Sequence, residues 1–157
     1  MKTIPPALLR NPIHLLSLGF GSGLAPKAPG TFGTLAALPL WFALQYLPAS
    51  SYIAVVVAAF ALGVYLCGET ARALGVHDHG GIVWDEFVGL WIALFLLPPG
   101  WPWLLLGFAL FRLFDIWKPW PIRVLDARVH GGLGIMIDDV LAGIYAFFVL
   151  QLLFVLL

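Results

Sequence analysis

The chain has 157 residues, of which 62% are hydrophobic and only 10% are charged, and its mean hydropathy is +1.00. A soluble domain of this length carries far more polar surface, so the composition predicts an integral membrane protein that forms one domain over residues 1–157. The formal net charge is zero, which gives no indication of a nucleic-acid partner. The one cysteine, Cys67, lies in an apolar run and cannot form an intrachain disulfide.

The N-terminal part is typical of a segment that precedes a first membrane helix. Residues 1–20 combine a few basic and apolar residues, and Pro5, Pro6 and Pro12 interrupt any signal-peptide core. We expect this part to lie on the membrane surface. A Gly/Pro-rich loop, "GFGSGLAPKAPGTFGT" at 19–34, then leads to the first span.

Three long intervals without Asp, Glu, Lys or Arg indicate the spanning helices, and they are residues 28–68, 87–111 and 140–157. A helix needs about 20 mostly apolar residues to cross the hydrocarbon core. The turn sequences "PASS" at 48–51 and "PPGWP" at 98–102 divide the first two intervals. The sequence therefore predicts an all-α, polytopic membrane helix bundle with about five transmembrane helices. Their expected ranges are about 32–47, 52–72, 82–97, 102–117 and 134–157.

Alternating spans place the charged residues on one side of the membrane. The turns at 48–51 and 98–102 and the C-terminus carry no charged side chain, whereas the N-terminal part and the loops around 69–81 and 118–133 do. The positive-inside rule makes the charged side cytoplasmic, so we expect the N-terminus inside and the C-terminus outside. Nothing in the sequence indicates the oligomeric state.

Two acidic pairs stand at the start of predicted spans: Asp85 and Glu86 in the first turn of the third, Asp138 and Asp139 in the first turn of the fifth. The helix dipole stabilises carboxylates there, so capping alone is one explanation. Apolar residues precede both pairs, however, which draws the acids towards the membrane, where ionisable groups usually mark function. A divalent cation such as Mg²⁺, which prefers oxygen ligands, would relieve the repulsion among four carboxylates.

A third group of charged residues lies in "FRLFDIWKPWPIR", residues 111–123. On a helix Arg112, Asp115 and Lys118 share roughly one face, and Lys118 lies at the negative C-terminal end, which favours a cation. Together with Arg123, the basic members are candidates for binding a phosphate group. The alternative is a positive-inside anchor with an internal Arg112–Asp115 pair.

The loop at 19–34 is a weaker candidate for phosphate binding through Thr31, Thr34 and Lys27. Glycine lets a backbone approach a ligand closely, and the start of the following helix favours an anion. The residue order is not that of a Walker phosphate loop. A turn-rich segment that re-enters the membrane interface explains the composition as well.

Four further polar residues have no assigned role. "HDHGG" at 77–81 could supply a general base or a metal ligand through His77, Asp78 or His79, and His130 is similar. A polar loop between spans is the alternative for all four.

Basic groups for phosphate, hydroxyl groups on a Gly-rich loop and acids for a metal together indicate metal-assisted phosphoryl chemistry at the inner leaflet. A proton- or cation-coupled small transporter is the main alternative, because it also uses clustered carboxylates. Such a transporter predicts acids near the bilayer midplane and often inverted repeats. Here the acids gather at one face and no repeat is evident.

The chain resembles the phosphatidylglycerophosphatase A family in four segments, in order. They are "GFGSGLAPKAPGTFGT", "HDHGGIVWDEFVG", "FRLFDIWKPWPIR" and "HGGLGIMIDDVLAG". The resemblance implies a Mg²⁺-dependent, multi-pass phosphatase of the bacterial inner membrane. Its substrate would be the phospholipid phosphatidylglycerophosphate, which it would hydrolyse to phosphatidylglycerol and phosphate during phospholipid synthesis.

The family's motif residues fall on named positions of this sequence. The resemblance assigns acidic roles to Asp85, Glu86, Asp115, Asp138 and Asp139. It pairs Asp115 with Lys118, and it matches Thr31 and Thr34, whereas the motif is tolerant at Lys27.

The mechanism expected on this basis has several open points. One or two Mg²⁺ ions would be held by the acidic pairs 85–86 and 138–139, and which member of each pair binds metal is open. Lys118, with Arg112 or Arg123, would offset charge on the phosphoryl oxygens. A carboxylate would either orient a water or form an aspartyl-phosphate.

Overall fold

The structure is a computed structural model that describes residues 3–156, and over this range it is all-helical. Two short 3-10 helices, η1 (Pro6–Arg10) and η2 (Gly19–Leu24), accompany eight α-helices. The α-helices are α1 (Pro12–Ser17), α2 (Pro29–Ala36), α3 (Leu38–Leu44), α4 (Ala49–Leu74), α5 (Trp84–Ala93), α6 (Trp101–Trp117), α7 (Ile122–Arg128) and α8 (Gly131–Leu156). The all-α prediction is therefore confirmed for the described residues.

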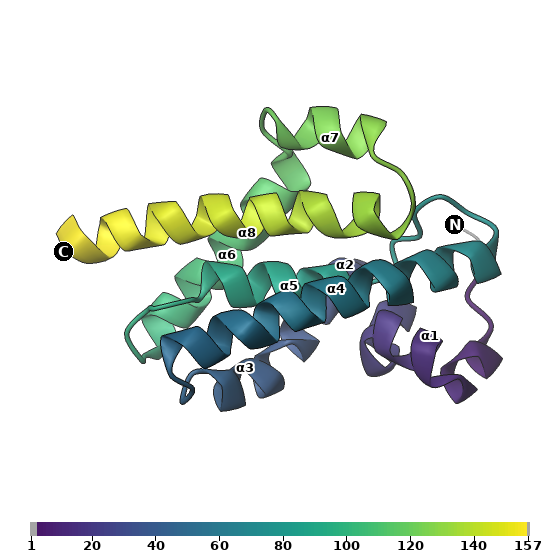
Figure 1. The fold of residues 1–157 in the computed structure, drawn as a ribbon, viewed down its shortest axis with the longest axis horizontal. Coiled ribbons are helices and arrows are strands. Elements are labelled where there is room, and N and C mark those ends of the chain that lie inside the picture. The colour runs from purple at the N-terminus through teal and green to yellow at the C-terminus, as the bar shows by residue number, and fades with distance from the viewer. Residues whose placement is uncertain (1–2, 157) are drawn as a thin grey trace.

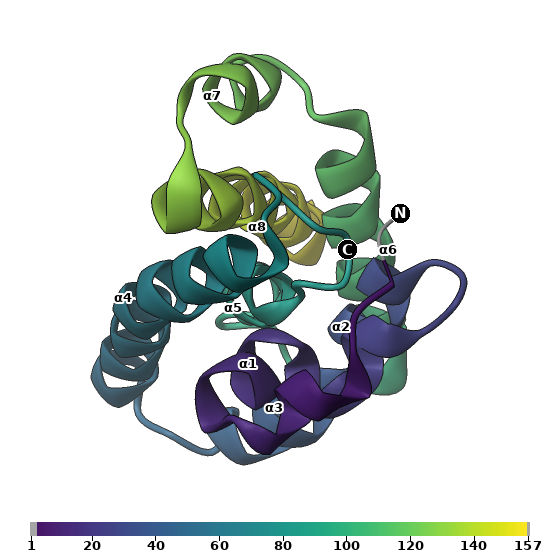
Figure 2. The ribbon, with the colours of Figure 1, turned by 90° about the vertical axis from the view of Figure 1, so that its right-hand side faces the viewer.

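Helix α5 forms the centre of the bundle. Figure 2 shows it enclosed by neighbouring helices, and it contacts α2, α4, α6 and α8. All of its ten residues except Ile92 are buried. Because α5 begins with Trp84, Asp85 and Glu86, the fold carries two acids directly into the protein interior.

Glycines allow the helices around α5 to approach closely. A Cβ atom added at Gly143 of α8 would overlap the carbonyl oxygen of Gly89 on α5. In the same way, a Cβ atom at Gly132 would overlap the Val64 carbonyl oxygen of α4. The absence of these side chains lets backbone pack against backbone, which sets the position of α8 against both helices.

Two helices, α4 and α8, are long and apolar enough to cross a membrane, judged by length and composition. They run in opposite directions along the length of the molecule, and the C-terminus lies at the end opposite the N-terminus (Figure 1). Only 33% of the most apolar stretch of α4 and 28% of that of α8 is buried. Large apolar side chains such as Val57, Phe148 and Val155 are exposed, which is expected where a helix faces lipid.

The prediction of five spanning helices is corrected, because only these two of the described helices are long enough. The five apolar segments are all helical, but the first is divided into α2 and α3 before Pro39. The third segment yields only the 10 residues of α5. A helix of that length reaches about 15 Å, half the thickness of the hydrocarbon core. Leu96, with φ 58°, and the Pro-Pro-Gly turn at 98–100 prevent its extension.

Candidate functional site

Three carboxylates from three helices meet at the first turn of α5. Oxygen atoms of Glu86 on α5, Asp115 on α6 and Asp139 on α8 lie within 4.8 Å of one another. We refer to these residues as the acid triad. Glu86 and Asp139 are buried, whereas Asp115 is partly exposed. Three oxygen donors at this separation are the ligand type that a hard divalent cation such as Mg²⁺ takes.

Helix α2, which takes up the second part of the segment 19–34 that the sequence predicts as a loop, holds Glu86 in place. The hydroxyl of Thr34, fully buried on α2, donates to Glu86 Oε2 at 2.7 Å and lies 2.9 Å from the Gly30 carbonyl oxygen. A Cβ atom at Gly30 would overlap Glu86 Oε1, so glycine at this position makes room for the carboxylate. Residues 30–34 therefore contact a member of the acid triad, whereas the sequence predicts Thr34 as a ligand of the substrate phosphate.

Arg112 joins two members of the acid triad. Its Nη1 lies 2.5 Å from Asp115 Oδ2 and 3.2 Å from Glu86 Oε1. The internal Arg112–Asp115 pair predicted from the sequence is present, but it also reaches α5. One guanidinium therefore offsets part of the charge of three acids. The fully buried Arg112 Nε has no hydrogen-bond partner within residues 3–156.

Lys118 lies between two other carboxylates. Its Nζ is 2.6 Å from Asp138 Oδ2 on α8 and 3.1 Å from Asp126 Oδ1 on α7. Burial lowers the pKa of Lys118, but the hydrogen bonds from its ammonium to Asp138 and Asp126 outweigh burial and raise that pKa above its ordinary value. Asp126 is absent from the residues that the sequence singles out. Its only signal there is its place eight residues after Lys118.

Asp138 and Asp139 lie deeper in α8 than predicted. Because α8 begins at Gly131 and has no acidic residue in its first turn, capping of a helix start does not explain this pair. Asp85 and Glu86 do lie in the first turn of α5, as predicted, but both are buried.

Several of these buried acids have an oxygen that no protein group satisfies. Within residues 3–156, Asp85 Oδ1, Asp138 Oδ1 and Asp139 Oδ2 are buried without a hydrogen-bond partner. A buried carboxylate left uncompensated is costly. The acid triad with its unpartnered Asp139 oxygen therefore fits a bound Mg²⁺ ion. Asp85 and Asp138 lie outside the triad, so their assignment as metal ligands stays a prediction.

The other predicted phosphate-binding residues lie at the surface or near it. Thr31 on α2 is half-buried, whereas Lys27 and Arg123 are exposed. Among the described residues, neither Lys27 nor Arg123 makes an ion pair. Their roles toward a substrate stay predictions.

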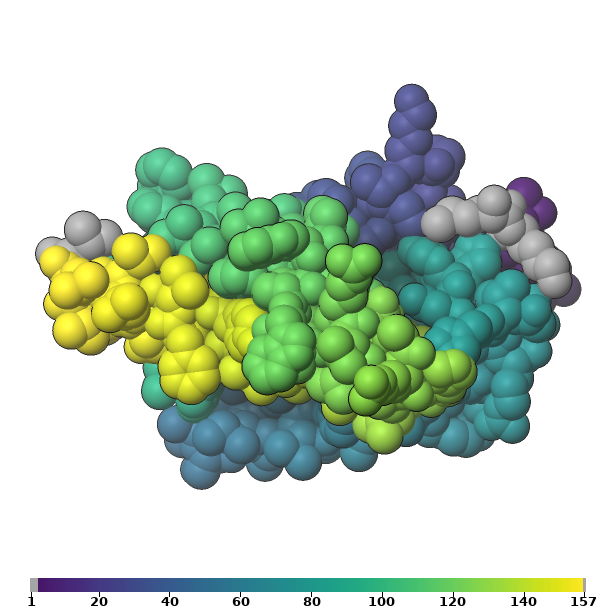
Figure 3. Space-filling model, turned by 90° about the horizontal axis from the view of Figure 1, so that it is seen from above, coloured from purple at the N-terminus to yellow at the C-terminus, as the bar shows by residue number. Residues whose placement is uncertain are grey.

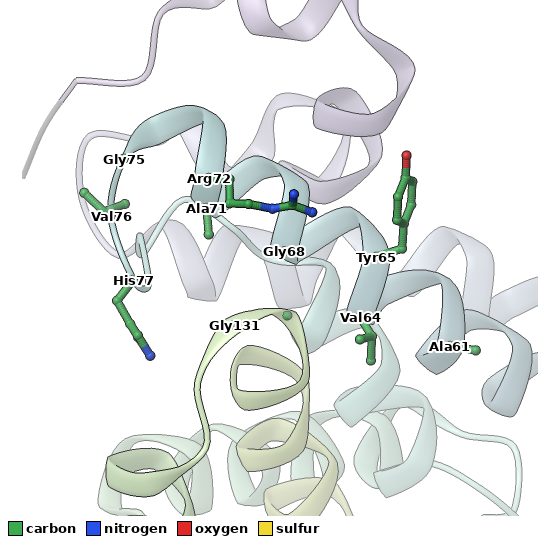
Figure 4. Close-up of a pocket in the computed structure, with 11 residues that line it drawn as sticks. Ala61, Val64, Tyr65, Gly68, Ala71, Arg72, Gly75, Val76, His77 and Gly131 are labelled. Atoms are coloured by element: carbon green, nitrogen blue, oxygen red, sulfur yellow. The ribbon is translucent and has the colours of Figure 1, made fainter.

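The histidines lie apart from the acid triad. The rings of His77 and His130 are in edge-to-face contact with their centroids 4.5 Å apart, and the buried His79 accepts a hydrogen bond from the Gly81 N–H at its Nδ1. Figure 4 shows His77 and Arg72 at a groove of about 800 Å³ between α4 and the start of α8. No acid of the triad lines this groove.

Comparison with known proteins found one family and several relatives. The family described as "Phosphatidylglycerophosphatase A" matches residues 15–154. The chain is 57% identical to phosphatidylglycerophosphatase A of Escherichia coli K12 over 137 residues, 87% of this chain and 80% of the relative. It is 55% identical to the protein of that name from Haemophilus influenzae over 140 residues, 88% of this chain and 86% of the relative.

A third relative bears a different name. A protein of Bacteroides thetaiotaomicron, named as a candidate phosphatidylinositol-3-phosphatase, is 42% identical over 141 residues, 85% of this chain and 87% of the relative. No solved structure matches the chain. The family match covers most of the chain and includes all three acids of the triad. The chain belongs to the phosphatidylglycerophosphatase A family.

Proposed function

We propose that this chain hydrolyses phosphatidylglycerophosphate to phosphatidylglycerol and phosphate with the help of Mg²⁺, at the cytoplasmic face of the bacterial inner membrane. Family membership makes it a phosphoric monoester hydrolase. The observation that carries the proposal is the acid triad, together with Lys118, which is held by Asp138, the neighbour of Asp139 on α8. A carboxylate cluster and a lysine supply the two kinds of group that phosphoryl transfer requires, which are metal ligands and cations for phosphate.

Glu86, Asp115 and Asp139 are the proposed Mg²⁺ ligands. When bound there, Mg²⁺ would withdraw charge from the phosphoryl oxygens and favour attack on phosphorus. Thr34 and Arg112 hold Glu86 in position for this role. Compared with the set expected from the sequence, this assignment brings in Asp115 and leaves out Asp85 and Asp138.

The other site residues act on the phosphate and on water. Lys118 and Arg112 donate hydrogen bonds to the phosphoryl oxygens and stabilise the charge that they carry in the transition state. We assign the orientation of the attacking water to Asp85. It is a buried acid outside the triad, and its Oδ1 is unpartnered within the described residues.

The arrangement of charge supports a cytoplasmic site. The basic residues lie in the N-terminal part, in the last turn of α4, and between the second half of α6 and the end of α7. None lies in the turns at 48–51 and 98–102. The positive-inside rule then places the acid triad at the cytoplasmic leaflet, with the C-terminus outside. The family match does not favour the transporter alternative.

The proposed substrate and metal are tested on the purified enzyme in detergent or vesicles. We expect phosphate release from phosphatidylglycerophosphate with Mg²⁺, loss of release with EDTA, and recovery when Mg²⁺ is added back. Phosphatidylinositol 3-phosphate serves as the competing substrate. No release from phosphatidylglycerophosphate by folded enzyme contradicts the proposed function, and faster release from the inositol lipid contradicts the substrate assignment.

Replacing an acid of the triad tests the metal site. Asp139→Asn keeps the shape of the side chain and removes its charge, so we expect kcat to fall by at least about 100-fold and Mn²⁺, used as a spectroscopic substitute, to bind more weakly. Glu69→Gln is the control, because within residues 3–156 Glu69 pairs only with Arg72, on the surface of α4. Normal turnover by Asp139→Asn would show that Asp139 is not a metal ligand of the site.

Two threonines on α2 provide a matched pair of variants. Thr34→Val removes the hydroxyl that holds Glu86, so we expect the Mg²⁺ concentration for half-maximal activity to rise by about 10- to 100-fold. Thr31→Val removes a hydroxyl that makes no hydrogen bond to the triad. It should leave the Mg²⁺ requirement unchanged. Equal Mg²⁺ requirements of the two variants would rule out the positioning of Glu86 by Thr34.

Single cysteines at the two ends of α4 test the membrane orientation. In a Cys67→Ala background, we expect Ser50→Cys to react with a membrane-impermeant maleimide in intact spheroplasts and Ala73→Cys to react only after permeabilisation. Both positions are exposed and lie near opposite ends of the helix. Labelling of both from the same side would show that α4 does not cross the membrane.

A further inference from the structure

The ammonium of Lys118 is held by acids from two different helices. Asp138 Oδ2 of α8 lies 2.6 Å from Lys118 Nζ, and Asp126 Oδ1 of α7 lies 3.1 Å from it. The side chain of Asp138 is 8% exposed and that of Asp126 is 40% exposed. Asp138 thus holds the lysine from the protein interior, and Asp126 holds it from the solvent side.

The backbone does not fix the lysine side chain. Lys118 follows the last residue of α6, has φ 47° and precedes Pro119, so no helix continues through it. A lysine side chain has a flexible four-carbon stem. The position of its ammonium therefore depends on the groups that accept its hydrogen bonds.

Helix α7 is itself fixed in place, which gives Asp126 a defined position. Ile122 of α7 is fully buried, and α7 packs on α8. Just before α7, the Trp120 carbonyl oxygen accepts a hydrogen bond from the Tyr145 hydroxyl of α8 at 3.0 Å. Figure 1 shows α7 lying along the first half of α8, and in the view from above it forms the nearest part of the surface (Figure 3).

We propose that Asp126 is a positioning residue for the phosphatase reaction, which acts by fixing the ammonium of Lys118 together with Asp138. An ammonium group has three N–H donors. Asp138 and Asp126 accept two of them, which leaves the third for a phosphoryl oxygen of the substrate. The role of Lys118 toward phosphate rests on the proposed function, whereas its fixation by Asp126 does not.

The exposure of Asp126 separates this role from a role in folding. A half-exposed ion pair contributes little to stability, so removing its charge should leave the protein folded. Without Asp126, Asp138 is the one carboxylate of the described residues that still pairs with the ammonium, which can then rotate about this contact. Substrate binding should not weaken, because the lost charge is negative and the phosphate is also negative.

Steady-state kinetics test the proposal. Asp126→Asn should lower kcat by about 10-fold without raising KM, and Asp126→Glu should restore part of the loss. In a Lys118→Ala background, Asp126→Asn should have no further effect on kcat, because the residue that it positions is absent. An unchanged kcat of Asp126→Asn, or the same fold-loss in both backgrounds, would overturn the proposal.

A second measurement does not depend on the substrate. At about pH 9, acylation of Lys118 by a water-soluble N-hydroxysuccinimide ester, followed by mass spectrometry, should be several-fold faster in Asp126→Asn than in the wild type. Glu69→Gln should not change this rate. An unchanged acylation rate would overturn the fixation of Lys118 by Asp126. If Asp126→Asn accelerates the acylation of Lys118 but the wild-type enzyme releases no phosphate, the proposed function is overturned and the fixation of Lys118 by Asp126 stands.

Discussion

The contact of Glu86 with Thr34 and Arg112 is the interaction on which the rest of the site depends. Glu86 lies in the first turn of a helix that the bundle encloses, and a buried carboxylate is costly unless hydrogen bonds and a cation compensate it. Thr34 supplies the hydrogen bond and Arg112 supplies the charge, at 2.7 and 3.2 Å. Because these partners come from α2 and α6, holding one acid fixes the packing of three helices. The missing side chain of Gly30 is part of the same arrangement.

Apart from Asp85, the charges of the site form two groups: one surrounds Arg112 and the other surrounds Lys118. The three carboxylates of the acid triad and Arg112 together carry a formal charge of −2. Asp126, Asp138 and Lys118 together carry a formal charge of −1. One divalent cation balances the first group, and its oxygen donors suit such an ion. The second group already has a cation at hydrogen-bond distance, so it is better suited to hold a lysine for a phosphate than to hold a metal.

The sequence predicts most of the helices and most of the residues of this site, but not how they pair. Apolar runs, bounded by charged loops and by the uncharged turns at 48–51 and 98–102, locate five helical segments, because hydrophobicity is a local property. The length of α5 could not be read in this way, since Leu96 takes a left-handed conformation that apolar composition does not indicate. The sequence indicates the pairing of Arg112 with Asp115 within one helix, but not that Asp115 meets Glu86 and Asp139 from two other helices. Asp126 was missed, because its contact with Lys118 depends on how α7 packs on α8.

The shortness of α5 explains how acids can be buried in this bundle and still lie where the proposed function needs them, near a phosphate group at the membrane surface. A helix of 10 residues cannot cross the hydrocarbon core by itself. Other helices can therefore surround it on all sides, including at its first turn. Here α4 and α8 are long enough to face lipid in its place, and close glycine contacts hold α8 against it. Asp85 and Glu86 are therefore screened from hydrocarbon by protein. Lys118, at the end of α6, keeps 26% of its side chain exposed, which leaves an approach from the polar side.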